Sequence, residues 1–346
     1  MNRSRLEQLC TLCGTSGREQ AVREYILQQL REIGIPEEDI KADRLGNLTV
    51  HKKGRMPAGA KVLFSAHMDE VALMVTAVNS DGTLSFDCVG GVNAAAVIGR
   101  TVRVGADAVS GVIGTKPVHH LSGKERNEPA EMSALYCDIG TSSAEETAEC
   151  GVSPGDVIYF DTVPQQLGDS FAAKAIDDRF GCELLLTMIS SDLPYDAEFA
   201  FVVQVEVGLR GAGVAAGAVD PDIAVVFEAT TAADLPDSQG ADRVCCLGGG
   251  AVISFMDGRT VYDKALYDAA VRLCESRGIA WQTKTKIAGG NDAGAIQNAG
   301  SGVRVLAVSV PCRYLHAPVS VIRLADAEAC EQLALALAET LPEESI

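Results

Sequence analysis

The sequence predicts an α/β protein in which a mostly parallel sheet carries helices on both faces and a small β-barrel is inserted into the chain. Three observations lead to this prediction. Strand-like apolar runs alternate with helical patterns in residues 1–70 and 166–346, an order typical of parallel sheets. Residues 71–165 instead contain short alternating runs separated by turn signals such as Asn79-Ser80-Asp81-Gly82. Hydrophobic residues make up 47% of the 346 residues, which is enough for a full core.

The first segment is expected to begin with helices and to end with a strand. Ser16 and Glu19 have the spacing of a capping box at the start of a helix. The apolar stripe that follows occupies one helical face and consists of Val22, Ile26, Leu30 and Ile33. Gly46-Asn47 indicates a turn before a strand, and the apolar strand 61–65 leads directly into Ala66-His67-Met68-Asp69.

After residue 166, strand and helix patterns alternate to the end of the chain. Expected strands are 199–205, 223–227, 281–287 and 303–310, and expected helices are 178–190, 211–217, 262–277 and 324–341. The strand Phe199–Val205 is the most informative, because it is apolar and is followed at once by a single acid, Glu206. Ligands of open α/β sheets bind at the carboxyl ends of the strands, so Glu206 lies where a site is expected.

Charge and cysteine usage narrow the class of protein. The net charge of −18 and the pI of about 4.7 argue against a nucleic-acid partner and against anionic membrane surfaces. No apolar run approaches the ~20 residues that span a bilayer, and the N-terminus lacks the apolar core of a signal peptide. The eleven cysteines are an odd number, which suits thiols in a reducing cytoplasm. Cys10 and Cys13 are interpreted as one helical face, with metal or redox chemistry as the less favoured alternative.

Five potential metal ligands share one placement, and they are His67, Asp177, Glu206, Glu228 and His316. Four of them follow a strand-like run directly or within a few residues, and the fifth, Asp177, opens a helix. All are therefore expected along one edge of the sheet. Two histidines and three carboxylates suit zinc, cobalt or manganese, and one carboxylate between two ions makes a two-metal site. Asp69 lies two residues from His67, where a carboxylate can accept the imidazole N–H.

Each of these residues also has an ordinary structural interpretation. A single histidine such as His67 is often buried and hydrogen-bonded without a metal. Asp177-Asp178 has the composition of a helix N-cap followed by a first-turn acid. Glu228 could be a surface acid and His316 a loop residue. Spacing alone leaves both interpretations open.

Six blocks of the sequence carry a family resemblance: SAHMDEVALMV, KAIDDRFGC, VQVEVGLRGAG, FEATTAAD, GGNDAGAIQ and VPCRYLHAP. They resemble the blocks of the dinuclear metallo-aminopeptidases of the tetrahedral type, which include glutamyl and deblocking aminopeptidases and members labelled endoglucanases. The resemblance implies a phosphorylase/hydrolase-like α/β domain, residues 1–70 and 166–346, interrupted by a β-barrel domain for oligomerisation or as a lid, residues 71–165. It also implies short peptides as substrates and a homo-dodecamer built from dimers.

The same resemblance assigns roles to the five potential ligands. It implies two divalent ions per subunit, zinc or cobalt with manganese as an alternative, held by His67, Asp177, Glu206, Glu228 and His316. Asp177 matches the bridging ligand, and the peptide bond between Asp177 and Asp178 is expected to be cis. Asp69 matches the acid that orients the first histidine.

One position departs from the family pattern at a residue that takes part in the hydrolysis reaction. The strand in family members ends in two glutamates, of which the second is Glu206 here. The first is the general base that takes a proton from the attacking water and delivers it to the leaving amine, and here it is replaced by Val205. Loss of such a base typically lowers the rate by about 10²–10⁴-fold. Ala72 and Ser320 also depart from the pattern, at positions where glycine and an acid are usual.

The leading hypothesis is therefore a cytoplasmic, metal-dependent aminopeptidase that removes N-terminal residues from short peptides and is impaired by Val205. Val205 has three open explanations: a natural loss of activity, which the departures at Ala72 and Ser320 favour, an engineered change, or a role shifted to another acid such as Glu70 or Asp292. The alternative is a catalytically inactive homologue that binds metal and peptide. A glycoside hydrolase is least favoured, because sugar sites use two opposed carboxylates and the acids here are assigned to metal.

Overall fold

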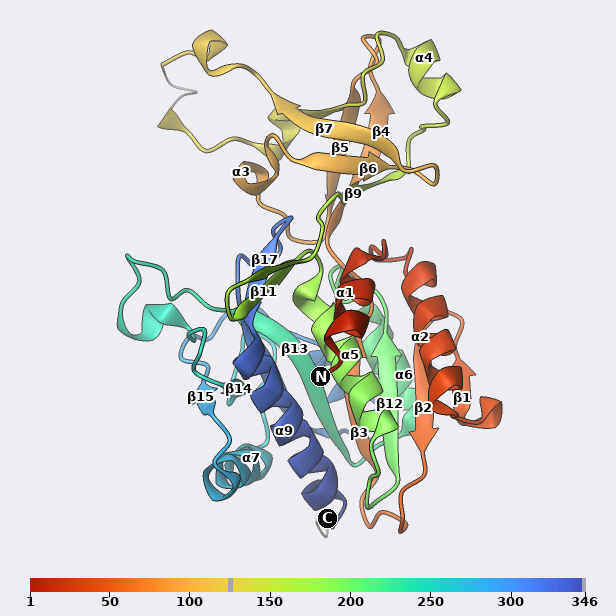
Figure 1. Ribbon diagram of the computed structural model, residues 1–346, viewed down its shortest axis with the longest axis vertical. Helices are drawn as coiled ribbons and strands as arrows, with labels where there is room; N and C mark the ends of the chain where they lie inside the picture. The colour runs from red at the N-terminus through yellow and green to blue at the C-terminus, as the bar shows by residue number, and fades with distance from the viewer. Residues whose placement is uncertain (124–126, 344–346) are drawn as a thin grey trace.

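A computed structural model describes residues 1–123 and 127–343 and shows a sheet domain with a separate barrel above it (Figure 1). The main sheet has 11 strands. They are β1 (Ile40–Ala42), β2 (Leu48–Lys52), β3 (Val62–His67), β10 (Gln165–Leu167), β11 (Ser170–Ala173), β12 (Ala197–Val202), β13 (Ile223–Thr231), β14 (Ala251–Ser254), β15 (Trp281–Thr283), β16 (Arg304–Arg313) and β17 (Ser320–Arg323).

The centre of this sheet is parallel and its edges are antiparallel. Strands β12, β3, β13 and β16 are neighbours in that order, and each pair is parallel. Outside them, β2 runs antiparallel to β12 and β17 runs antiparallel to β16. The expected parallel sheet is therefore present at the core, while short connections such as the one between β16 and β17 add antiparallel strands. The sheet as a whole is mixed.

Helices cover both faces of the sheet, as expected. They are α1 (Arg3–Thr11), α2 (Gln20–Ile33), α5 (Ile176–Ser190), α6 (Arg210–Val219), α7 (Lys264–Arg277), α8 (Ala293–Ile296) and α9 (Leu324–Thr340). Alternate residues of the strands face the two layers. Phe64 stacks between Phe199 and Phe227 on the face covered by α1, α2, α5, α7 and α9, whereas Leu63 packs with α6 and α8 on the other. This two-sided burial explains the continuous apolar runs of the central strands.

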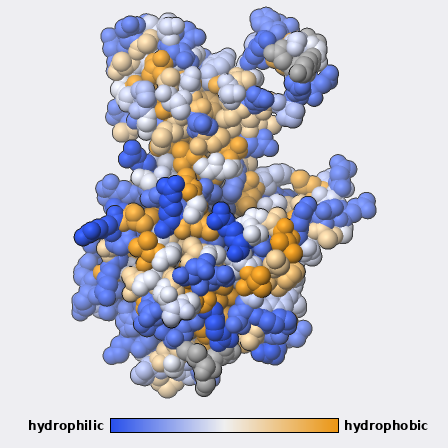
Figure 2. Space-filling view, turned by 180° about the vertical axis from the view of Figure 1, so that it is seen from behind, coloured by the Kyte–Doolittle hydropathy of each residue, from blue (hydrophilic) through white to orange (hydrophobic). Residues whose placement is uncertain are grey.

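The inserted segment forms a closed barrel, which confirms the predicted change of architecture. Its strands are β4 (Ala72–Val78), β5 (Leu84–Val89), β6 (Thr101–Val104), β7 (Val109–Thr115), β8 (Leu135–Asp138) and β9 (Val157–Phe160). Two short helices, α3 (Ala94–Val97) and α4 (Ala144–Glu149), lie outside it. Four residues separate the end of β3 from the first barrel strand, so the carboxyl ends of the parallel strands face the barrel (Figure 1). Seen from behind, apolar side chains gather where the two parts meet (Figure 2).

The strand predicted over 223–227 is longer than expected and includes Glu228, because β13 pairs with β16 as far as Thr231. Three other predictions about elements were wrong for tertiary reasons. The strand predicted to reach Val205 ends at Val202, because the next four amides pair with side chains instead of a neighbouring strand. The strand predicted over 281–287 stops at Thr283, because β14, its one ladder partner within residues 1–123 and 127–343, ends at Ser254. The capping box does not form: Ser16 Oγ donates to Asp69, and α2 begins at Gln20 without a side-chain cap.

Among the described residues 1–123 and 127–343, no helix is long and apolar enough to cross a membrane.

Candidate metal centre

The five predicted ligand residues converge at the barrel-facing end of the sheet. His67 Nε2 lies 3.4 Å from Asp177 Oδ1 and 3.6 Å from Glu228 Oε2. His316 Nε2 lies 3.4 Å from Asp177 Oδ2 and 3.3 Å from Glu206 Oε1. Asp177 thus lies between the two histidines and presents one oxygen to each, with one further glutamate beside each ring.

Different elements supply these side chains. His67 is the last residue of β3, and Glu228 lies within β13, the neighbouring strand. Asp177 opens α5, Glu206 follows β12, and His316 lies after β16 on a left-handed backbone (φ 59°). A site assembled from several strand ends is the arrangement expected of an open α/β sheet.

Asp178 lies behind the centre. The peptide bond between Asp177 and Asp178 is cis, and the two carboxylates have different surroundings. Asp178 accepts from Gly181 N at 2.9 Å and from His67 N at 3.3 Å, so it is engaged with backbone groups. Asp178 could also join His67 and Glu228 around an ion, since their ligand atoms lie within 4.8 Å of one another.

The donor set fits divalent cations. Asp177 Oδ1 and Glu228 Oε1 are buried and accept no hydrogen bond within the described part of the chain. Burial, with the charge of Asp177 added, raises the pKa of Glu206 and of Glu228 to about 7. Although burial favours the neutral ring, hydrogen bonding to Asp177 and the charge of Glu206 raise the pKa of His316 to about 9. Such a crowded set of acids needs a compensating positive charge, which two borderline ions with N and O ligands would supply.

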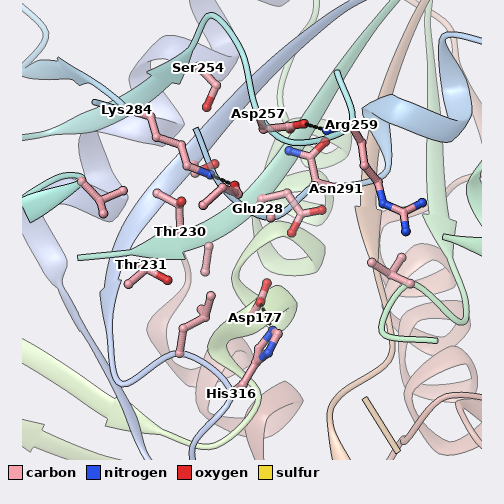
Figure 3. Close-up of a pocket in the computed structure, with 18 of the residues that line it drawn as sticks. Asp177, Glu228, Thr230, Thr231, Ser254, Asp257, Arg259, Lys284, Asn291 and His316 are labelled. Carbon is pink, nitrogen blue, oxygen red and sulfur yellow. Dashed lines mark hydrogen bonds and ion pairs between the residues drawn. The ribbon is translucent and has the colours of Figure 1, made fainter. Parts of the chain in front are cut away.

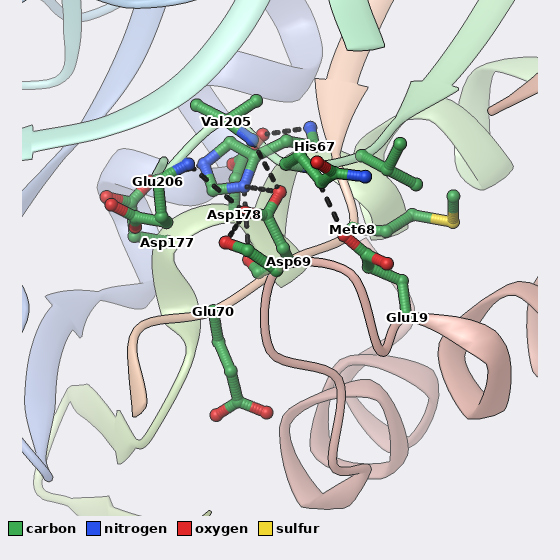
Figure 4. A network of polar contacts seen from close by, with 12 residues as sticks. Glu19, His67, Met68, Asp69, Glu70, Asp177, Asp178, Val205 and Glu206 are labelled. Atoms are coloured by element: carbon green, nitrogen blue, oxygen red, sulfur yellow. Dashed lines mark hydrogen bonds and ion pairs between the residues drawn. The ribbon is translucent and has the colours of Figure 1, made fainter. Parts of the chain in front are cut away.

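Asp69 connects His67 to the segment that follows β12. Its carboxylate accepts from Ser16 Oγ at 2.6 Å, Val205 N at 3.0 Å and Glu206 N at 3.1 Å. The ring of His67 faces Asp69 through Nδ1, which lies 3.1 Å from the Asp69 carbonyl and 3.4 Å from its carboxylate. The backbone carbonyl is nearer to the ring than the carboxylate is. Because both groups of Asp69 face Nδ1, both contribute to the orientation of His67 (Figure 4).

Val205 borders the cavity beside these donors. The cavity has a volume of about 570 Å³ and is lined by His67, Asp177, Val205, Glu206, Glu228 and His316 among others. Val205 is 9% exposed and packs in the apolar cluster between the sheet and α6. A valine at this point brings no proton acceptor to the cavity.

The two acids considered as replacement bases are both buried, and neither lines that cavity. Glu70 is 2% exposed, and Lys174 Nζ donates to both of its oxygens at 2.7 Å. Arg179 also donates to Glu70, so the carboxylate is held in a buried ion-pair network. Asp292 is fully buried, and burial followed by the charge of Glu228 raises its pKa well above the usual value. Neither acid lines the cavity.

Sequence reasoning missed the opposite wall of the cavity and the contact from the barrel. Lys284 lines the cavity, and its Nζ donates to Ala288 O at 3.2 Å (Figure 3). From the barrel side, a Cβ at Gly91 would lie 3.3 Å from His316 Nδ1. A Cβ at Gly90 would lie 3.1 Å from Glu206 Cβ. In the sequence, the Gly90-Gly91 pair indicates a place where another segment can come close to the backbone. A lysine in a strand-like run does not indicate a place in a cavity wall.

Known proteins show the same architecture over the whole chain. The family model described as M42 glutamyl aminopeptidase matches residues 46–333. The lysyl aminopeptidase of Pyrococcus furiosus is 31% identical over 336 residues, covering 95% of this chain and 94% of that protein.

Two solved structures are also similar. The TET aminopeptidase of Thaumarchaeota archaeon SCGC AB-539-E09 superposes with a TM-score of 0.92 at 29% identity, covering 98% of this chain and 96% of that one. The TET1 peptidase of Pyrococcus horikoshii, which can assemble into a tetrahedron or a large octahedral shell, superposes with a TM-score of 0.84 at 33% identity, covering 97% and 99%. The chain therefore belongs to the M42 glutamyl aminopeptidase family, a family of metal-dependent aminopeptidases.

Proposed function

We propose that this protein binds two divalent metal ions and the N-terminal end of short peptides, and that it hydrolyses the first peptide bond slowly because Val205 occupies the general-base position. The observation that carries the proposal is the pairing of an intact donor set with an apolar residue at the cavity wall. His67 and His316 each lie beside one oxygen of Asp177, and each has one further glutamate beside its ring, while Val205 borders the same cavity without a group that accepts a proton. Binding of metal and cleavage of peptide are therefore separable in this chain.

One ion would be held by His67, Asp177 and Glu228, and the other by Asp177, Glu206 and His316. When bound, zinc or cobalt, or manganese as the alternative, would supply Lewis acidity toward the peptide carbonyl. The protein itself fixes the donors: Asp69 holds the ring of His67 and the amides of Val205 and Glu206. The acids cluster around the histidines, which supports a peptidase site over the opposed carboxylates of a glycoside hydrolase.

The cavity wall favours a substrate whose first side chain is acidic. Lys284 is half-buried and lines the cavity that Glu228 also lines, and its ammonium donates to Ala288 O (Figure 3). Lys286 also lines the cavity, but it is exposed and lies 3.4 Å from Asp242 Oδ1. A half-buried ammonium with one backbone acceptor has capacity to bind a carboxylate. We propose that Lys284 binds the side chain of an N-terminal Glu or Asp.

The experiment measures binding and cleavage of the same dipeptides by the wild-type protein with Zn²⁺. Glu-Ala is expected to bind more tightly than Leu-Ala and to remain uncleaved over a time in which an active family member consumes it. Lys284→Met should weaken Glu-Ala binding by about tenfold or more, because a hydrogen bond to a charged group is lost. Lys286→Met is the matched control. Rapid cleavage by the wild type would refute the slow chemistry, and equal loss for both dipeptides would refute the role of Lys284.

We also propose that the barrel, residues 71–165, serves self-association and covers the metal centre. The approach of Gly90 and Gly91 to Glu206 and His316 supports the second role. The tetrahedral assembly of the similar Pyrococcus horikoshii peptidase supports the first, and a dodecamer built from dimers is the expected form. Light scattering should show a large oligomer, whereas a stable monomer would contradict this expectation.

A further inference from the structure

The backbone amides of segment 203–206, which follows β12, are held by side chains, while the carbonyls of residues 203–205 accept from backbone amides of residues 208–211. Four consecutive backbone N–H groups each donate to a buried side-chain oxygen from another loop. The bonds are Val203 N to Asn47 Oδ1 at 2.9 Å, Gln204 N to Glu19 Oε1 at 3.1 Å, Val205 N to Asp69 Oδ1 at 3.0 Å, and Glu206 N to Asp69 Oδ2 at 3.1 Å. A strand would have used a neighbouring strand for these bonds. Here the chain leaves the sheet, and side chains define its path.

The backbone of this segment needs such support. Gln204 is left-handed (φ 58°), a conformation that is costly for residues other than glycine. The chain then turns back, since Gly211 N donates to Val203 O at 3.0 Å. The turn is tight: a Cβ at Gly211 would lie 2.3 Å from Asn47 Oδ1 and 2.5 Å from Val203 O. Residues 203–211 therefore form one compact turn, with Val205 and Glu206 on its cavity side.

Glu19 is the least expected of the three acceptors. It lies immediately before α2, is 4% exposed, and reaches Gln204 across 185 positions of the chain (Figure 4). The same oxygen, Oε1, also accepts from Gly17 N at 2.8 Å. Neither bond caps α2, so the Glu19 side chain bonds to residues outside the helix that it precedes. A buried carboxylate is costly unless it is hydrogen-bonded, and these two backbone N–H groups provide that compensation.

We propose that Glu19 is a positioning residue for the metal centre: by accepting from Gln204 N it fixes the left-handed turn that orients Glu206, and the side chain at position 205, toward the ions. The inference rests on the proposed metal function. It differs from the role of Asp69, which touches His67 directly, because Glu19 acts only through the backbone of Gln204. One oxygen makes both bonds, so the amide oxygen of glutamine can replace it.

The test compares Glu19→Ala, Glu19→Gln and Glu24→Ala by titration with Co²⁺, followed by the visible absorption of the bound ion and by calorimetry. Glu24 is an exposed acid on the same helix, so its removal changes the net charge equally. Glu19→Ala should weaken Co²⁺ binding by about 10-fold to 100-fold, the usual effect of losing a group that orients a ligand. Glu19→Gln and Glu24→Ala should stay within about threefold of the wild type, because the acceptor or the segment is retained.

Two results of the titration would overturn the inference. Wild-type affinity in folded Glu19→Ala would show that the bond to Gln204 does not position Glu206. Equal weakening in Glu19→Ala and Glu19→Gln would show that the charge of Glu19 matters and not the acceptor. If Glu19→Ala keeps the wild-type Co²⁺ affinity but loses thermal stability in the metal-free state, the role of Glu19 is structural only.

Amide hydrogen exchange tests whether the turn is held as proposed, even if Glu19→Ala folds poorly or the wild type binds no Co²⁺. The amides of residues 203–206 should exchange slowly in the metal-free wild type, and Glu19→Gln should preserve this protection. Fast exchange of these amides in the wild type would overturn the inference. Slow exchange without any Co²⁺ binding would instead refute the proposed metal function and leave the turn as described.

Discussion

Val205→Glu is expected to raise kcat/KM on aminoacyl-p-nitroanilides by about 10²–10⁴-fold over the wild type, in the presence of Zn²⁺ or Co²⁺. The backbone at this position is already fixed, since Val205 N donates to Asp69 and the side chain borders the cavity. A glutamate built on that backbone brings a carboxylate to the cavity beside the metal donors. It supplies the proton acceptor that valine lacks, so only the chemical step should change.

Val205→Gln is the matched control for this prediction. Glutamine has the length of glutamate but accepts no proton from water at neutral pH, so its rate should remain at the wild-type level. Metal content of the three proteins is measured in parallel, because a change in metal loading would imitate a change in chemistry. Equal rates for the glutamate and glutamine variants, with both loaded, would show that the missing base is not what limits this chain.

Metal affinity is expected to rise by roughly 100-fold or more between about pH 6 and about pH 8, because bound ions require deprotonated ligands. The metal-free pKa of Glu206 and of Glu228 is about 7, and that of His316 is about 9. At the lower pH all three groups hold protons that an ion must displace. Each displaced proton contributes up to about tenfold in apparent affinity per pH unit.

The raised pKa values of Glu206 and Glu228 also determine whether rising pH stabilises or destabilises the metal-free protein. The two glutamates have a higher pKa in the folded, metal-free protein than in the unfolded chain, so between about pH 4.5 and about pH 7 the native state binds more protons. Their contribution therefore destabilises the metal-free protein as pH rises through this window. Calorimetry with Co²⁺ in buffers of different ionisation enthalpy measures the protons released, and melting curves should show a wider gap between loaded and metal-free protein at high pH. Equal affinity at both pH values would contradict the donor assignment.

Much of the site was accessible from the sequence because its donors follow apolar strands. Hydrophobic runs alone placed Glu206 and Glu228 near the carboxyl ends of parallel strands, which lie together at one edge of the sheet. In the structure Glu206 follows β12 after a turn, whereas β13 continues through Glu228 to Thr231. The barrel could be predicted because its short strands and turn signals differ from the α/β rhythm on either side. Spacing left the metal role of each residue open, however, and the family resemblance selected among the alternatives.

What the sequence could not show depends on contacts between distant segments. Ser16 and Glu19 have the spacing of a capping box, yet Asp69 and Gln204, far along the chain, use them as partners instead. The predicted strand did not extend to Val205 for the same reason, because local apolar character says nothing about which acceptors lie nearby. Lys284 follows directly after the end of β15 and lines the cavity, and no local pattern marks that end.

The most direct test of the account is the anomalous diffraction of wild-type crystals that have been soaked with Zn²⁺ and Glu-Ala. The account predicts two zinc peaks, one among His67, Asp177 and Glu228 and one among Asp177, Glu206 and His316, with an intact dipeptide in the cavity beside Val205. Absence of zinc from these side chains would contradict the metal centre. A dipeptide already cleaved after a short soak, in which only an active family member would turn it over, would contradict the conclusion that the chain binds its substrate without efficient hydrolysis.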